Sequence, residues 1–338
     1  MSIRVLKPGL LSTFQDAGRT GSQHLGVQVS GAMDPRAHRL ANLLVGNEAD
    51  LATLEITMLG PTLQFEAPAC FAIAGADMQA MLNDSPVPNH RPLVARAGDV
   101  LTLGPATPGS GVRAYLAVHG GYELAPVLAS TSTDIRGAFG GHAGRALTKN
   151  DLIGLRYALP DSEDDLSDLA QTLWQVRIYL PAALALRPRS RLRVLPGVHW
   201  DEFTAESQRE LLEAEYRIST QSDRMGYRLE GPKLSMTTPR QILSEAASFG
   251  TIQVPSGGEA IVLMADRQST GGYPKIAQVI SVDLPDLAQR RPGQPVCFAP
   301  VELDEAQQLD SELEDAFEQV HEVLAAARTV LESIAKPK

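Results

Sequence analysis

The pattern of hydrophobic and polar positions is most informative between Gly250 and Val279. One apolar segment, Thr251 to Val254, ends at a proline, a serine and two glycines, and a second, Ala260 to Ala265, is almost wholly apolar. This pattern predicts two β-strands, the second of them buried on both faces. A run of polar residues and a glycine pair follow the second strand. Such a run is costly for stability alone and is typical of a binding site, where glycine lets the backbone approach another group closely.

Short apolar stretches recur along the rest of the chain, separated by glycine and proline at intervals of roughly 8 to 15 residues. This rhythm predicts an all-β barrel or sandwich rather than alternating strands and helices. We therefore expect a mainly β protein with an N-terminal β domain over residues 1–185 and a second β domain over residues 186–300.

A few helices interrupt the strands. Asp34 is a favourable N-cap, Pro35 suits the first helical position and Gly46 suits the position after the end, so a helix is predicted between them. Residues 200–214 resemble a second short helix. The acidic stretch Asp161 to Asp168 contains few apolar residues and is interpreted as a loop.

The C-terminal segment, residues 301–338, has apolar residues at spacings of three and four. This spacing predicts an amphipathic helix whose other face carries Glu and Asp. The helix is expected to pack on its own domain, and the alternative is a coiled-coil contact with another protein chain.

Composition narrows the function classes. The 338-residue chain carries a net charge of −10, which disfavours a nucleic-acid partner because phosphate binding needs clustered Lys and Arg. The two cysteines, Cys70 and Cys297, lie far apart without metal-binding spacing, so no metal site is predicted. No signal peptide and no long apolar run is evident, so we expect a cytoplasmic protein with no membrane partner.

The polar run after the second strand supplies the candidate catalytic residues. Asp266 is a candidate general base or an acceptor for a substrate N–H, and its alternative role is to cap the following loop. Gln268 is suited to orient an amide, and Tyr273 offers a hydroxyl or a flat apolar wall. No P-loop, His-Glu-x-x-His motif or nucleophile elbow is found.

Candidate binding residues lie on both sides of this run. Arg224 is a candidate clamp for a substrate carboxylate, because its planar fork binds carboxylates in bidentate fashion, while an ion pair with Asp223 is the structural alternative. The other candidate substrate-binding residues are Tyr227, Ser256, Thr270, Gly271 and Gly272. Arg136 and Arg145 flank a glycine-rich loop and are candidates for binding an anion.

Several motifs carry a family resemblance that covers roughly residues 3–300. They are the stretches Ser222 to Leu229 and Gly250 to Val279, together with Thr13 to Arg19, Gly31 to Asp34 and Asn47 to Thr57. The sequence closely resembles the family that contains the C subunit of 5-oxoprolinase together with allophanate hydrolase subunit 2, also called KipA-like or biotin-dependent carboxyltransferase-like. The resemblance implies two tandem β-barrel domains of cyclophilin-like topology.

The resemblance also implies function. The first hypothesis is the C subunit of an ATP-dependent 5-oxoprolinase, which opens the lactam of 5-oxo-L-proline to L-glutamate with Mg-bound ATP. This enzyme needs two further chains, its A subunit plus a KipI-like B subunit. The second hypothesis is a carboxyltransferase component that moves a carboxyl group to urea or a related amide, with biotin carried on another chain. The third is a regulatory protein that counters an inhibitor of a kinase.

Overall fold

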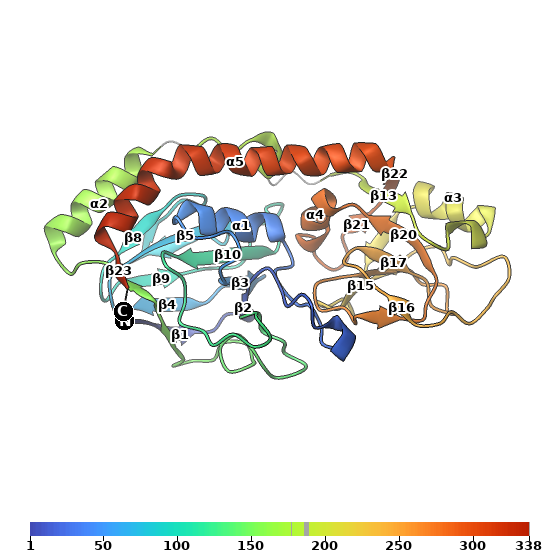
Figure 1. Cartoon of the computed structure of the whole chain (residues 1–338), viewed down its shortest axis with the longest axis horizontal. Coiled ribbons are helices and arrows are strands. Elements are labelled where there is room, and N and C mark those ends of the chain that lie inside the picture. Colours follow the sequence, from blue (N-terminus) through green and yellow to red (C-terminus); the bar gives the residue numbers. More distant parts are fainter. Residues whose placement is uncertain (177, 186–188, 338) are drawn as a thin grey trace. The chain divides into compact units, whose positions relative to one another are not determined.

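The computed structural model describes residues 1–176, 178–185 and 189–337. It divides the chain into two compact units, both built mainly from β-strands (Figure 1). The first unit contains Met1–Gly18, Asp34–Leu186 and Glu314–Lys338, and the second contains Arg19–Met33 and Arg187–Leu313. The predicted fold class, mainly β with a few short helices and a C-terminal helix, is confirmed.

The observed units differ from the predicted contiguous domains in two places. Residues 19–33 belong to the second unit, because Met33 lies in its hydrophobic core and Gly31 accepts a hydrogen bond from Arg224. The last helix is divided between the units at residues 313 and 314. Residues 186–188, where the predicted boundary lies, are outside the described residues.

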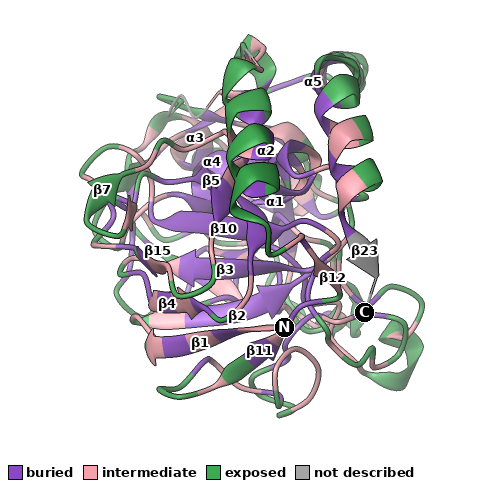
Figure 2. Ribbon diagram, turned by 90° about the vertical axis from the view of Figure 1, so that its left-hand side faces the viewer, coloured by how far each residue is buried: buried purple, intermediate pink, exposed green. Residues whose placement is uncertain are grey.

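The first unit contains two larger sheets whose apolar side chains share one core. The six-stranded sheet has the order β11 (Leu152–Gly154), β1 (Ser2–Lys7), β4 (Thr62–Phe65), β9 (Val100–Thr102), β6 (Met81–Leu82), β7 (Ser85–Pro86). The five-stranded sheet has the order β2 (Leu11–Gln15), β3 (Thr53–Thr57), β10 (Arg113–Val118), β5 (Ala69–Gly75), β8 (Leu93–Ala95). Figure 2 shows that β3, β5 and β10 are almost wholly buried. β12 (Tyr157–Ala158) pairs separately with β23 (Lys336–Pro337).

Helix α1 (Pro35–Leu44) begins as predicted, since Asp34 accepts a hydrogen bond from the backbone N–H of Ala37. It packs against β5 and β10. The prediction of a loop over the acidic stretch is wrong, because α2 (Glu163–Gln175) begins within it. Ser162 caps this helix, acidic residues in the first turn suit the helix dipole, and buried leucines continue the helical spacing to residue 173. A 3₁₀ turn, η2 (Ala182–Leu184), follows.

The second unit is an eight-stranded sheet that nearly closes into a barrel around its own core. Its order is β21 (Pro295–Val296), β14 (Tyr216–Ile218), β15 (Gly226–Glu230), β18 (Ile261–Leu263), β17 (Thr251–Gln253), β20 (Lys275–Val279), β13 (Leu192–Pro196), β22 (Phe298–Pro300). A two-stranded ribbon, β16 (Glu245–Ala246) and β19 (Thr270–Gly271), is separate from the barrel sheet. The two strands predicted between residues 251 and 265 are therefore confirmed as β17 and β18, and they pair with each other.

Short helices complete the second unit. The predicted helix over 200–214 consists of η3 (Trp200–Glu202) and α3 (Ala205–Glu213), because Thr204 caps a new helix after Phe203. The other helices are η1 (Gln23–Leu25), η4 (Ser281–Asp283) and α4 (Leu284–Ala288).

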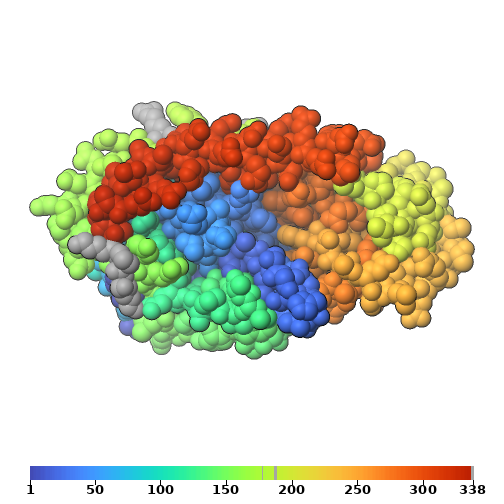
Figure 3. All heavy atoms as spheres, in the orientation of Figure 1, coloured from blue at the N-terminus to red at the C-terminus, as the bar shows by residue number. Residues whose placement is uncertain are grey.

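The predicted C-terminal helix is confirmed as α5 (Leu303–Ile334). Its apolar residues at spacings of three and four, such as Phe317, Val320 and Leu324, are buried within the chain. Arg39 of α1 stacks on the ring of Phe317 and pairs with Glu314, so this part of α5 packs on its own unit. The outward face of the helix is open to solvent (Figure 3).

Candidate functional site

The second unit contains a cavity of about 330 Å³. Four segments form it: the loop that follows β17, the turn that links β19 to β20, the loop before β16, and Phe203 between η3 and α3. The lining residues are Phe203, Leu234, Ser235, Met236, Pro239, Arg240, Gln241, Ile242, Val254, Pro255, Ser256, Gly272, Tyr273 and Pro274. Three of the sequence-predicted site residues, Ser256, Gly272 and Tyr273, are therefore brought together here.

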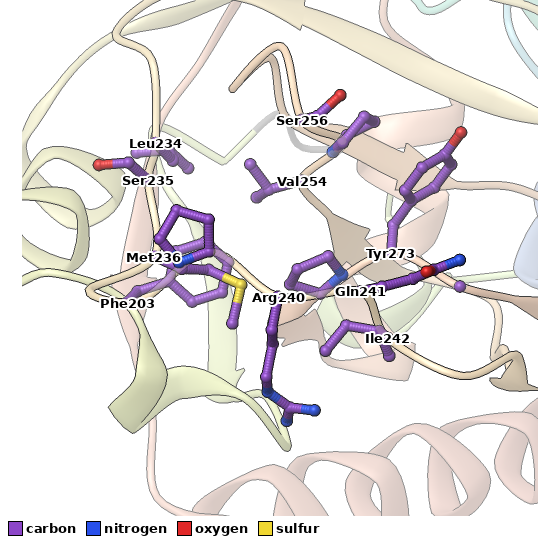
Figure 4. Close-up of a pocket in the computed structure, with 14 residues that line it drawn as sticks. Phe203, Leu234, Ser235, Met236, Arg240, Gln241, Ile242, Val254, Ser256 and Tyr273 are labelled. Carbon is purple, nitrogen blue, oxygen red and sulfur yellow. The ribbon is translucent and has the colours of Figure 1, made fainter.

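The walls of the cavity are mainly apolar, with a few polar groups at its edges. Figure 4 shows Phe203, Met236 and Val254 around the cavity, with the hydroxyls of Ser256 and Tyr273 on one side of the view. The guanidinium of Arg240 extends to the opposite side. Apolar walls with a few placed polar groups are typical of sites for small molecules.

Arg240 is engaged by a carboxylate. Its Nε and Nη2 lie 2.8 and 2.7 Å from the two carboxylate oxygens of Glu202. The hydrogen bonds from Arg240 hold the pKa of Glu202 below its usual value. The pair brings almost no net charge to the cavity, so the lining suits a neutral or weakly polar group.

The β16–β19 ribbon adjoins the cavity, because the lining residues Ile242 and Gly272 immediately flank its two strands. Lys275, the next residue after the lining, extends its side chain to this ribbon. Its ammonium donates to Glu245 Oε2 at 2.9 Å and to the carbonyl of Ala246 at 2.8 Å. The hydrogen bond to Glu245 lowers the pKa of that carboxyl. Sequence reasoning missed both Lys275 and Glu245.

Arg224 and Asp266 form a buried ion pair. Arg224 Nε donates to Asp266 Oδ2 at 2.8 Å and Nη2 donates to Oδ1 at 3.0 Å. The same Nη2 lies 2.7 Å from the carbonyl oxygen of Gly31. The bidentate face of Arg224 is therefore occupied by Asp266, and neither residue lines the cavity. Their roles as clamp and general base stay predictions.

The remaining predicted residues are dispersed. Asp223 accepts hydrogen bonds from the backbone of Met225 and Gly226 and so shapes a turn. Tyr227 is buried in the barrel core. Gln268 and Thr270 are exposed, and Gly271 lies in the ribbon.

The two arginines predicted to bind an anion lie in the first unit. Arg136 is exposed. Arg145 makes two hydrogen bonds to Asp151, which hold the pKa of that carboxyl well below its usual range. The guanidinium of Arg145 is therefore already paired with a carboxylate of the same unit. The anion-binding role of both arginines stays a prediction.

A buried polar face in the first unit was not predicted. On β2, β3 and β10, apolar side chains face the core, and polar side chains such as Gln15, Glu55 and Tyr115 face the other way. The hydroxyl of Tyr115 donates to Glu55 at 2.8 Å. His38 of α1 contacts Thr53 on the same face, and burial lowers its pKa to about 4. The alternation Thr13-Phe14-Gln15 was the signal that could have revealed this face.

The described residues contain no group of three or more His, Cys, Asp or Glu side chains placed to hold a metal ion. Within the same residues, no helix has both the length and the apolar character needed to cross a membrane.

Residues 25–300 match the carboxyltransferase domain, subdomain A and B. The chain is also 40% identical to the C subunit of 5-oxoprolinase from Escherichia coli over 318 residues, which are 94% of this chain and 97% of that protein. The chain belongs to this family. Its members also include domains of much longer enzymes.

Among these longer relatives, urea amidolyase of Saccharomyces cerevisiae is 31% identical over 91% of this chain, but the match spans only 17% of that enzyme. The crystal structure of the Kluyveromyces lactis urea carboxylase superimposes on 94% of this chain with a TM-score of 0.83 and 28% identity, and the match covers 29% of that chain. The family fold therefore occurs both as a separate protein and as a domain of multidomain enzymes.

Proposed function

We propose that this chain is the C subunit of an ATP-dependent 5-oxoprolinase complex, which opens the lactam of 5-oxo-L-proline to L-glutamate together with its A and B subunits. The observation that carries the proposal is the 40% identity to a protein named as the C subunit of 5-oxoprolinase, over nearly the full length of both chains. A complex of this kind would act in the cytoplasm, where its substrate and ATP are found.

The cavity in the second unit suits part of this substrate. Its volume of about 330 Å³ lies at the small end of the range for small-molecule sites. Its apolar walls match the methylene groups of a lactam ring. The hydroxyls of Ser256 and Tyr273 and the amide of Gln241 can hydrogen-bond to the ring amide.

The same cavity does not suit ATP. Among its lining residues, all of which are described, Arg240 is the only cation, and Glu202 already pairs with it. A triphosphate needs several cations or backbone donors. We therefore assign ATP binding to other parts of the complex and assign no phosphoryl-transfer step to this cavity.

A carboxyltransferase role is the second candidate. It is supported by the family match over residues 25–300 and by the structural similarity to urea carboxylase. Urea and a lactam share an N–C=O unit, so a cavity of one type can hold either. In this role biotin would be carried on another chain.

The test is to co-purify this chain with candidate A and B subunits and to assay 5-oxoproline-dependent release of ADP and glutamate, with and without avidin. Glutamate formation that needs all three chains and is insensitive to avidin is expected. An assembly that makes no glutamate but carboxylates urea in an avidin-sensitive manner, once a biotin carrier is added, would favour the second candidate.

Tyr273 provides a test of the cavity itself. Its side chain is 49% exposed, so replacing it should not unfold the chain. We expect Tyr273→Ala to raise the KM for 5-oxoproline about tenfold through loss of a wall and a hydroxyl contact. Tyr273→Phe separates the two contributions. Tyr179→Ala, at an 80% exposed tyrosine of the first unit, is the matched control, and an unchanged KM in Tyr273→Ala would exclude the residue from the site.

A further inference from the structure

Two pairs of residues face each other beside the cavity. In the ribbon, Glu245 of β16 lies directly opposite Gly271 of β19. In the barrel sheet, Gln253 of β17 lies directly opposite Lys275 of β20. Residues that are directly opposite in an antiparallel pair have their side chains on the same face, at close spacing.

Contacts join the two pairs into one cluster. Lys275 Nζ donates to Glu245 Oε2 at 2.9 Å. Gly271 lies against the amide of Gln253, because a Cβ added to this glycine would be 2.6 Å from Gln253 Nε2. The ribbon therefore covers a buried ammonium and a buried amide, and the only carboxylate in the cluster is that of Glu245.

The two side-chain donors of this cluster are buried, whereas its carboxylate is partly exposed. The Lys275 side chain is 9% exposed and Gln253 is 5% exposed, whereas the Glu245 side chain is 46% exposed. Gln253 Nε2 has no hydrogen-bond partner among the described residues. A buried donor without a partner is costly, so its presence points to a group that arrives from outside.

The cluster adjoins the cavity without lining it: Gln253 and Lys275 are the chain neighbours of the lining residues Val254 and Pro274. Gly272, which lines the cavity, follows Gly271 directly, and a Cβ added to it would lie 3.0 Å from the carbonyl oxygen of Ile242, another lining residue. Both residues of β16 are exposed, and the strand is held by its pairing with β19 and by the two hydrogen bonds from Lys275. Outward movement of β16 would open the cavity toward Lys275 and Gln253.

We propose that Lys275 Nζ and Gln253 Nε2 form a carboxylate-binding subsite of the cavity, and that Glu245 occupies it until a substrate carboxylate displaces it. The inference rests on the proposed function, since 5-oxoproline bears one carboxylate on the ring carbon next to the lactam nitrogen. The ring then lies in the apolar cavity and its carboxylate reaches the two donors. Urea has no carboxylate and would leave Glu245 in place.

The energetics favour such an exchange. An ammonium hydrogen-bonded to a carboxylate is a strong pair, and the ligand forms the same pair that Glu245 gives up. The released Glu245 carboxylate is already close to half exposed and becomes fully hydrated, so its release into water carries no desolvation cost. The additional hydrogen bond from Gln253, whose donor has no partner among the described residues, compensates for the bond from Lys275 to the Ala246 carbonyl that is lost when β16 moves.

The experiment compares two probes on the full-length chain by calorimetry: 5-oxo-L-proline and 2-pyrrolidinone, which is the same lactam without the carboxylate. The variants are Lys275→Met, which removes the ammonium and keeps the apolar stem, and Glu245→Gln, which removes the competing charge. The control is Lys233→Met, which removes the exposed ion pair with Glu259 in the same unit. Binding of 2-pyrrolidinone reports that each variant is folded.

We expect the wild type to bind 5-oxoproline at least about tenfold more tightly than 2-pyrrolidinone. Lys275→Met should abolish this preference, Glu245→Gln should tighten binding of 5-oxoproline alone, and Lys233→Met should change neither. Equal affinities for the two probes in the wild type, no binding of 5-oxoproline, or a preference that survives in Lys275→Met would overturn the proposal. Glutamate formation by the three-chain assembly is scored separately, so an active assembly without carboxylate preference refutes only the subsite, and the reverse result refutes only the proposed function.

Discussion

Replacing Asp266 with alanine is expected to lower the free energy of unfolding by about 3–5 kcal/mol, because it removes one partner of a buried, doubly hydrogen-bonded ion pair with Arg224. The two side chains are only 7% and 11% exposed and make two hydrogen bonds to each other. The measurement is chemical denaturation of the whole chain, followed by its tryptophan fluorescence, to which Trp200 of the second unit contributes.

The matched control is Glu215→Ala, which breaks the exposed pair between Arg217 and Glu215 and should cost less than about 1 kcal/mol. The double variant Arg224→Leu with Asp266→Ala should recover part of the lost stability, since the buried guanidinium is removed together with the carboxylate. If Asp266→Ala keeps its stability but the assembly loses a hundredfold or more in turnover, Asp266 is the general base predicted from the sequence and not a structural partner.

Asp16 is expected to be the second position with a large effect. Its carboxylate accepts hydrogen bonds from the hydroxyls of Ser130 and Ser132 and from both the backbone N–H and the hydroxyl of Thr131. The backbone N–H of Gly18 adds a further bond. Asp16→Ala leaves several buried donors without an acceptor, so we expect a loss on the order of 3–5 kcal/mol in the free energy of unfolding.

The dependence on pH follows from the same contacts. Burial alone would raise the pKa of Asp16, but the hydrogen bonds, led by that of Ser132, outweigh burial and lower it. A carboxyl whose pKa is lowered on folding stabilises the protein above its unfolded pKa of about 3.9, and this contribution disappears as the pH falls through the folded pKa. Asp16→Ala should therefore flatten the loss of stability below about pH 4, measured by denaturation at a series of pH values.

The control for Asp16 is Asp161→Asn, at an exposed position before α2. It should leave both the stability and its pH dependence within about 0.5 kcal/mol of the wild type. An Asp16→Ala variant that unfolds on acidification as steeply as the wild type would show that other carboxyls dominate this region.

Local signals in the sequence predicted much of the fold. The caps at Asp34 and Gly46 and the spacing of the tail located α1 and α5. The error at α2 arose because the acidic first turn was interpreted without the leucines that follow it. The assignment of residues 19–33 to the second unit depends on Met33 entering a core whose other residues are far away in the sequence, and no local pattern encodes that.

The candidate site likewise contains residues that local sequence signals predicted and residues that only long-range strand pairing reveals. Ser256 and Tyr273 stand out locally, beside glycines that end strands, and the structure places both at the cavity. Lys275 and Glu245 were missed because each is unremarkable by itself. Their meaning comes from the pairing of β16 with β19 and of β17 with β20, which is decided by long-range packing. Arg224 and Asp266 were both predicted to be site residues. Because 42 positions separate them, the ion pair between them could not be inferred from the sequence.

Residues 19–33 lie between two segments of the first unit in the chain but belong to the second unit, which limits how the gene can be divided by recombination. A gene fragment encoding only residues 187–313 would produce a barrel without Met33 in its interior and without the Gly31 carbonyl that Arg224 contacts. The two units therefore cannot be exchanged or duplicated separately by simple recombination at their boundary. We expect both units to be retained together whenever this region is fused to other domains. The relatives fit this expectation, because urea amidolyase carries the whole block within a chain several times longer.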